Sequence, residues 1–424
     1  MTQRTVLDNG IRVLSEDVPG CHSVSLGVWV NNGSRHEPMA LNGISHFVEH
    51  MLFKGTKRRT AQCLAREVDS VGGLINGFTS REFSCYFVKI LAEKLTLAVD
   101  LLGDMICHSS FNAEEIEKER RVILQEIAMI EDNPEDLVHD QFTHAFWAGH
   151  PLGMPVIGTR STVQGVERQV MLSFMADRYV GDNLCIVAAG SVNHAELVEL
   201  AGKAFGEIPG SGVKPMDVAP VVTRRIEVRH RELEQTQVCL GVEGLQQNHP
   251  DRYGTYLLNT ILGGNMSSRL FQKVREELGL AYSVYSYHHN HSDSGAFIVS
   301  AGVDAAQAPL VVRTILDEMT RIREELVSEE ELQSAKDFLK GSMLLAMEST
   351  DNRMTRLAKN ELFLRDAGTS LEQSRQMIDA VSAELVQDLA QQLFVDETLN
   401  LQVAGRVVED DFPDRDLRLG RSGI

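Results

Sequence analysis

Three side chains that could bind and use a metal ion lie close together near the N-terminus of this 424-residue chain. His46 and His50 are four residues apart, and Glu49 directly precedes His50. At about 100° per residue, all three side chains project from one face of a helix. Two imidazoles one turn apart can bind a single zinc ion, and the glutamate would then stay close to a metal-bound water molecule. The spacing therefore predicts a zinc site with Glu49 as a general base.

The other positions of this helix argue against a chance pairing of two histidines on a solvated helix face. They are almost all apolar, namely Ile44, Phe47, Val48 and residues 51–53. Three ionisable groups on such a helix are costly unless a metal ion or hydrogen-bonding partners compensate them. The order His-x-x-Glu-His is also that of the inverzincin peptidases, the reverse of the commoner zinc-peptidase motif.

A third protein ligand would complete a catalytic zinc site that keeps one position open for water. The helix expected at 113–130 carries Glu119 and Glu126, which lie about 20° apart on one face because they are two turns apart. Glu126 interrupts an apolar run, which is unusual unless its carboxylate is coordinated. The glutamates at 114, 115 and 117 are typical of a solvated first turn favoured by the helix dipole. From the residues alone, a metal ligand and a solvated carboxylate are equally good interpretations of Glu126.

The elements that must position these residues occur twice along the chain, which indicates an internal repeat. In the first half we expect a strand, a helix, an alternating run and two helices at 23–31, 41–53, 78–88, 91–107 and 113–130. The second half repeats this order at 236–242, 253–262, 283–300, 308–325 and 328–347. Each half then closes on a similar strand ending in glycine, at 183–190 and 398–405. This pattern predicts an α+β fold of two homologous, mostly antiparallel sheet-plus-helices halves.

A boundary between the halves is expected where three prolines and three glycines occur between residues 206 and 220. Such a segment has little potential for helices or for strand pairing. We therefore expect an N-terminal zinc-binding catalytic domain at 1–210, a linker at 211–220 and a homologous C-terminal domain at 221–424.

The second half is expected to lack a metal site of its own. Its counterpart of the metal helix, at 253–262, has no His-x-x-Glu-His, so we expect one zinc ion per chain. His288, His289 and His291, near Asp293, lie in a hydrophilic stretch that is typical of a hairpin loop and not of a second metal site.

Composition excludes several classes of partner. The 41 basic and 60 acidic residues give 41 − 60 = −19, a surplus that repels nucleic acid and anionic lipid headgroups and favours cationic partners. No window approaches the roughly 18 apolar residues of a membrane-spanning helix. The first ten residues have no apolar or Arg/Ser-rich leader, and the six cysteines include no Cys-x-x-Cys. These features suit a bacterial cytoplasmic protein with free thiols that binds neither nucleic acid nor membranes.

Residues 46–56 resemble the metal motif of the pitrilysin/insulinase family of zinc peptidases, most closely the mitochondrial processing peptidase branch that includes bacterial processing proteases. Segments 72–82, 150–153 and 263–271 match further motifs, so the resemblance covers nearly the whole chain. It implies the mitochondrial processing peptidase/LuxS-like metallohydrolase fold. It also implies that Glu126, 126 − 50 = 76 residues after the second histidine, is the third zinc ligand. Glu119 would be a second acidic residue of the catalytic site that orients a histidine or the water.

The resemblance also indicates residues that bind substrate. Asn76 begins an alternating run and is either a turn asparagine or part of an edge strand that accepts an extended peptide, with its amide near the scissile carbonyl. Arg275 and Tyr282 look like the family's arginine and tyrosine pair, although a helix-end arginine and a packed strand tyrosine are the plainer interpretation. The family usually carries alanine after the asparagine, whereas this chain has Gly77.

Together these features predict a zinc metalloendopeptidase for extended or unfolded, presequence-like peptides. Zinc would be held by His46, His50 and Glu126, and Glu49 would take a proton from water and pass it to the leaving amine. Two such chains would close into a homodimeric clamshell around the peptide. The alternative is a non-catalytic structural or partner-binding subunit of the same fold, which typically loses metal or base residues that are all retained here.

Overall fold

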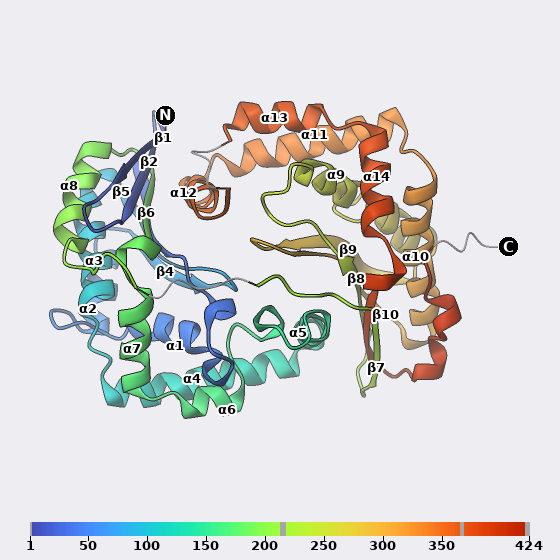
Figure 1. Ribbon diagram of the computed structural model, residues 1–424, viewed down its shortest axis with the longest axis horizontal. Coiled ribbons are helices and arrows are strands. Elements are labelled where there is room, and N and C mark those ends of the chain that lie inside the picture. Colours follow the sequence, from blue (N-terminus) through green and yellow to red (C-terminus); the bar gives the residue numbers. More distant parts are fainter. Residues whose placement is uncertain (1, 213–217, 365–368, 420–424) are drawn as a thin grey trace. The chain divides into compact units, whose positions relative to one another are not determined.

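The computed structural model describes residues 2–212, 218–364 and 369–419 (Figure 1). Residue contacts group the chain into two units, each drawn from three segments. Unit 1 contains residues 1–128, 154–217 and 346–368, and unit 2 contains 129–153, 218–345 and 369–424. Each unit thus includes a helix from the other half of the sequence. The linker expected at 211–220 lies partly outside the described residues.

Unit 1 is built on a six-stranded sheet in which β4 is an edge strand. The order is β1-β2-β6-β3-β5-β4, and all neighbours are antiparallel except β2 and β6. The strands are β1 (Thr2–Val6), β2 (Arg12–Asp17), β3 (Ser23–Val30), β4 (Leu74–Thr79), β5 (Ser84–Leu91) and β6 (Leu184–Gly190). Strands β3 and β6 are almost entirely buried, which indicates that both faces of the sheet are covered.

Helices cover both faces of this sheet. The main core lies between one face and a group of helices from the N-terminal half. These are α1 (Ile44–Leu52), α2 (Ala61–Asp69), α3 (Leu95–His108), α4 (Ala113–Asp132), α6 (Arg160–Gly165), α7 (Arg168–Arg178) and α8 (His194–Phe205). The opposite face packs on α12 (Thr350–Lys359) (Figure 1). There Trp29 and Cys185 join Met354 and Leu357 in a smaller apolar cluster.

Unit 2 repeats this plan on a five-stranded sheet of order β7-β11-β8-β10-β9, in which only the β7 and β11 pairing is parallel. Its strands are β7 (Arg225–His230), β8 (Thr236–Glu243), β9 (Ala281–Asn290), β10 (Gly295–Val303) and β11 (Asn400–Gly405). One face packs on α9 (Arg252–Leu262), α10 (Ala308–Glu324), α11 (Glu329–Ala346), α13 (Leu371–Asp379) and α14 (Ala383–Leu393). The other face packs on α5 (Pro134–Phe146), which comes from the N-terminal half of the sequence.

The α+β prediction is confirmed, and most predicted elements lie within a few residues of the observed ones. The two alternating runs are the exception. Each was expected as a single run, but 78–88 contains the end of β4, a turn and most of β5, and 283–300 contains most of β9, a turn and most of β10. A period-two pattern continues across a tight turn when both strands of a hairpin present the same face to the core.

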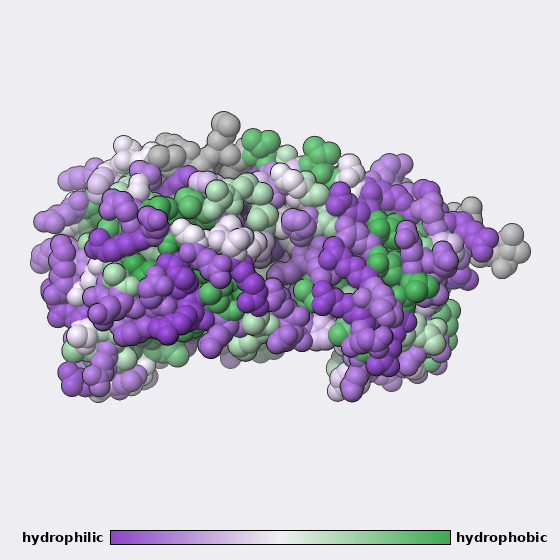
Figure 2. Space-filling view, turned by 90° about the horizontal axis from the view of Figure 1, so that it is seen from below, coloured by the Kyte–Doolittle hydropathy of each residue, from purple (hydrophilic) through white to green (hydrophobic). Residues whose placement is uncertain are grey.

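The surface and the cysteines agree with the composition. On the face seen in Figure 2, hydrophilic side chains dominate and apolar side chains are scattered among them. All six cysteines are free, three of them buried and three partly buried. In the described parts of the chain, none of the helices combines the length and apolar character needed to cross a membrane.

Candidate metal centre

A buried carboxylate fixes the N-terminal end of α1, the helix with the histidine motif. The Oε2 atom of Glu37 accepts the N–H of Gly43 at 2.7 Å, and its Oε1 atom accepts the N–H of Ser45 at 2.7 Å. The amide of Asn42 donates to the same carboxylate at 3.2 Å. Gly43 has φ 93°, a left-handed conformation that favours glycine. Burial raises the pKa of Glu37 to about 7, although the three hydrogen bonds favour its charged form.

The sequence of α1 divides the helix into a buried and a functional face. The buried face includes Phe47, Val48, Met51 and Leu52. The side chains of His46 and His50 retain 17% and 16% exposure on the other face. The predicted one-face arrangement of the motif is therefore observed, and its imidazoles are accessible to a ligand.

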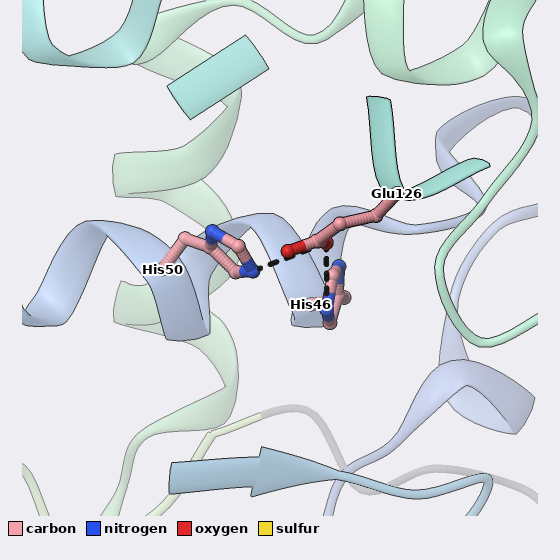
Figure 3. Close-up of side chains that lie close together, drawn as sticks. All are labelled: His46, His50 and Glu126. Atoms are coloured by element: carbon pink, nitrogen blue, oxygen red, sulfur yellow. Dashed lines mark ion pairs between the residues drawn. The ribbon is translucent and has the colours of Figure 1, made fainter. Parts of the chain in front are cut away.

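The structure brings His46, His50 and Glu126 together (Figure 3). The carboxylate of Glu126, on α4, points between the two imidazoles. Its Oε2 atom lies 3.9 Å from Nε2 of His46 and 3.6 Å from Nε2 of His50. Within residues 2–212, 218–364 and 369–419, this is the one group of three or more potential ligands whose donor atoms all lie within 4.8 Å of each other.

These distances fit a shared zinc ion better than direct hydrogen bonds. Ligand atoms about 2.1 Å from a tetrahedral zinc ion are separated by about 3.4 Å, close to the observed spacings. Burial, and to a smaller extent the neighbouring His50, lowers the pKa of His46 to about 4, so this imidazole is neutral and its lone pair is available at neutral pH. The donor set therefore suits zinc, with three protein ligands of the types that catalytic zinc sites use.

Helix α4 is held against α1 by Arg120, which directly follows Glu119. Its guanidinium carbon lies 5.3 Å from the centre of the Phe47 ring, and Nη2 donates to the Val166 carbonyl at 2.8 Å. The neighbouring Glu119 then points toward α1, where its Oε2 atom lies 3.0 Å from Nδ1 of His50. With its hydrogen on Nδ1, His50 donates to Glu119 and presents the lone pair of Nε2 toward Glu126.

Glu49 receives a contact that the sequence did not indicate. Thr79, the last residue of β4, donates a hydrogen bond from its hydroxyl to Oε2 of Glu49. Burial raises the pKa of Glu49, and this hydrogen bond opposes the rise. Thr79 lies within the segment 72–82 that carries the family resemblance, but its role depends on the position of β4 beside α1.

Two further residues of the centre were missed at the sequence level. Glu37 lies outside the motif and acts through backbone N–H groups. Lys54 follows α1 and places Nζ 2.7 Å from Oε1 of Glu119. A local signal existed for Lys54, since it follows His50 by four residues and so continues the functional face of the helix.

Asn76 lies on the edge strand β4, as the substrate-binding interpretation requires. Its side chain is exposed, and its Oδ1 atom accepts the N–H of Gly77 at 2.8 Å. A Cβ atom at Gly77 would approach Cε2 of Phe53, the residue that follows α1, to 3.1 Å, so β4 packs closely on the end of this helix. The role of Asn76 stays a prediction.

Arg275 and Tyr282 contact each other in unit 2. Arg275 lies in the π-helical segment Phe271–Glu277, a type of helix often found at functional sites. Its guanidinium carbon lies 4.8 Å from the centre of the Phe271 ring and 5.1 Å from that of the Tyr282 ring. Tyr282 is 78% exposed, so it is not the packed strand tyrosine of the plainer interpretation. Substrate binding by this pair stays a prediction.

The histidines near the β9–β10 turn do not form a metal site among the described residues. The hairpin-loop prediction is wrong for His288 and His289, which lie in β9, and only His291 follows the strand. His288 packs against Tyr256, with ring centres 4.6 Å apart, whereas His291 packs against Trp147 at 5.1 Å. Polar residues on an edge strand produced a sequence pattern typical of a loop.

Glu126→Gln should lower zinc binding because a neutral amide is a weaker zinc ligand than a carboxylate. We expect a loss larger than the roughly 10–100-fold that follows removal of an outer-shell partner. Zinc per chain after dialysis measures the effect, with Glu114→Gln, an exposed position on the same helix, as the control. Full zinc retention by the Glu126→Gln protein would place the third ligand elsewhere.

Glu37 should make the stability of the metal-free protein depend on pH. Its folded-state pKa lies above the ordinary value of 4.5, so its stabilising contribution is complete below about pH 4.5 and is lost as pH rises through about 7. The difference in unfolding free energy between the wild type and Glu37→Gln should fall by up to about 3 kcal/mol over this range. Urea unfolding at several pH values measures it, and a pH-independent difference would contradict the assignment.

Comparison with known proteins indicates the family to which this chain belongs. The model described as Insulinase (Peptidase family M16) matches residues 12–160, and the Peptidase M16 inactive domain matches residues 165–339. The "Uncharacterized zinc protease YmxG" of Bacillus subtilis is 40% identical over 397 residues, which cover 94% of this chain and 97% of that protein. The "Uncharacterized zinc protease SCO5738" of Streptomyces coelicolor is 40% identical over 370 residues, or 85% and 80% of the two chains.

Solved structures share the fold at lower identity. A protease from Helicobacter pylori superposes with a TM-score of 0.88 at 22% identity, covering 95% of this chain and 99% of that one. A chain of Complex III2 from Candida albicans gives a TM-score of 0.84 at 21% identity, with 98% of both chains covered. At these identities the structures show the common fold alone, whereas the relatives at 40% identity show the family. The chain belongs to the insulinase family, peptidase family M16.

Proposed function

We propose that this protein is a zinc-dependent metalloendopeptidase for oligopeptides or unfolded, presequence-like peptides. The observation that carries the proposal is the convergence of His46, His50 and Glu126, with Glu49 on the same helix face. The names of its bacterial relatives as zinc proteases support a peptidase.

The residues around the centre can perform peptide hydrolysis in two proton transfers. Zinc, when bound, would polarise the attacking water and the scissile carbonyl. Glu49 accepts a proton from the water as the new C–O bond forms, and it then donates this proton to the amine as the C–N bond breaks. Thr79 holds one oxygen of Glu49, and the other oxygen would accept the proton. The partial burial of Glu49 raises its pKa and makes it a stronger base.

We propose that an extended peptide binds along β4 as an additional strand. Strand β4 is the outermost strand of its sheet and ends at Thr79, the partner of Glu49, so pairing with it would bring the peptide backbone close to the base. Asn76 would contact the substrate near the scissile carbonyl. Arg275 and Tyr282 would bind the peptide from the homologous domain at 221–424.

A non-catalytic structural or partner-binding subunit is the alternative in a different class. The similarity of the fold to a Complex III2 chain is compatible with it, but fold alone carries no activity. The retained ligand set and general base favour the enzyme. We further propose a bacterial cytoplasmic location.

Glu49→Gln should abolish turnover while zinc stays bound, since an amide cannot accept the proton of water and the three ligands are unchanged. A loss of at least about 10²-fold in kcat is expected. A quenched-fluorescence peptide assay, run beside a zinc determination and the Glu114→Gln control, measures both quantities. Turnover close to wild type by the Glu49→Gln protein would refute the role of Glu49, and zinc-loaded wild type without turnover would favour the alternative.

The active protein should be a homodimer that cleaves oligopeptides and leaves compact folded proteins intact. The chain carries the metal motif and the arginine and tyrosine pair together, so a second copy is the simplest partner for a closed chamber. Light scattering at micromolar concentration should give about twice the chain mass of 47.1 kDa. A fully active monomer at this concentration would contradict the proposal of a chamber closed by two chains.

A further inference from the structure

Lys54 is joined to the candidate metal centre through a single buried carboxylate. Its Nζ atom lies 2.7 Å from Oε1 of Glu119, while Oε2 of the same carboxylate lies 3.0 Å from Nδ1 of His50. The two oxygens of Glu119 thus have different partners, one cationic and one imidazole. Nε2 of that imidazole faces Glu126. A continuous line of polar contacts therefore runs from Lys54 to the ligand atom of His50.

The burial of these groups distinguishes the contact from an ordinary surface ion pair. The Glu119 side chain retains only 7% exposure, and that of Lys54 retains 31%. A buried carboxylate that loses one partner is left poorly compensated, whereas most exposed ion pairs contribute little. Lys54 also lies just beyond the C-terminal end of α1, where a cation is favoured by the helix dipole.

The charge of the centre gives Lys54 a second effect. Three carboxylates, those of Glu49, Glu119 and Glu126, surround two imidazoles that bind metal in their neutral form. With a divalent cation these groups would sum to −1, and Lys54 brings the sum to zero. The lysine also holds Oε1 of Glu119, so that Oε2 stays directed to Nδ1 of His50.

We propose that Lys54 is a positioning residue of the metal centre. Its ammonium fixes Glu119, Glu119 fixes the ring orientation and tautomer of His50, and Nε2 of His50 is thereby directed to the metal. This inference rests on zinc binding by the proposed centre. It does not require that the centre hydrolyse peptides.

Zinc affinity of the full-length protein, measured by competition with a chromophoric chelator, tests the role directly. Lys54→Met removes the charge and keeps a side chain of similar length, and we expect a rise in the zinc Kd of about 10-fold or more. Lys54→Arg keeps the cation and should stay within about threefold of wild type. Lys57→Met removes an exposed lysine of the same loop and should leave the Kd unchanged.

A double-mutant cycle separates positioning from a general effect of charge or folding. Glu119→Gln alone should weaken zinc binding, and adding Lys54→Met to it should cost less than about twofold more, because the lysine acts through Glu119. The melting temperature of the metal-free Lys54→Met protein, which should fall because Glu119 loses a partner, measures the effect on folding separately from the effect on zinc affinity. An unchanged zinc Kd for Lys54→Met, or the full loss persisting in the Glu119→Gln background, would overturn the proposal.

These outcomes are distinguishable from failure of the proposed function. Zinc-loaded wild type that cleaves no peptide, combined with the predicted cycle, would refute the peptidase and retain the role of Lys54. Normal peptide cleavage by the wild type, with a zinc Kd unaffected by Lys54→Met, would refute the role of Lys54 and retain the peptidase.

Discussion

Helix α1 has to satisfy two opposing demands, and much of the surrounding structure follows from them. One face of the helix belongs to the apolar core of unit 1, while the other presents two imidazoles and a carboxylate at partial exposure. Imidazoles bind metal only when they are neutral and correctly oriented, so the helix must be held in place without hydrogen bonds that occupy Nε2. The surrounding residues meet this demand from outside the helix. Glu37 accepts the free N–H groups at its start, and Glu119 takes the Nδ1 side of His50.

The centre draws its parts from three elements that tertiary packing brings together. Helix α1 supplies the histidines and the proposed base, α4 supplies Glu119 and Glu126, and the edge strand β4 supplies Thr79. The hydrogen bond of Thr79 joins the proposed base, Glu49, to the strand proposed to bind substrate. Thr79 therefore connects the position of the Glu49 carboxylate to the position of β4.

The periodicity of the sequence was enough to predict features that depend on a single helix or strand. The i, i+3, i+4 spacing of the motif placed its three side chains on one helix face, and the seven-residue spacing of Glu119 and Glu126 placed both toward α1. The family resemblance, not the residues alone, selected Glu126 over a solvated carboxylate. Contacts made by Glu37 and Thr79 could not be predicted, because they depend on how a loop and an edge strand approach α1. The sequence also could not show that α5 packs in unit 2 and α12 in unit 1. An amphipathic pattern predicts that a helix has a buried face but does not specify which sheet that face covers. Alternation likewise could not show the turns within 78–88 and 283–300.

The central claim is that His46, His50 and Glu126 jointly bind one zinc ion through side chains whose places the fold already determines. A crystal of the zinc-loaded protein, measured at the zinc absorption edge, tests this most directly through its anomalous difference map. The account predicts one strong peak per chain, about 2.0–2.2 Å from Nε2 of both histidines and from a carboxylate oxygen of Glu126. A peak coordinated by other residues, or no peak between α1 and α4 in zinc-loaded crystals, would contradict it.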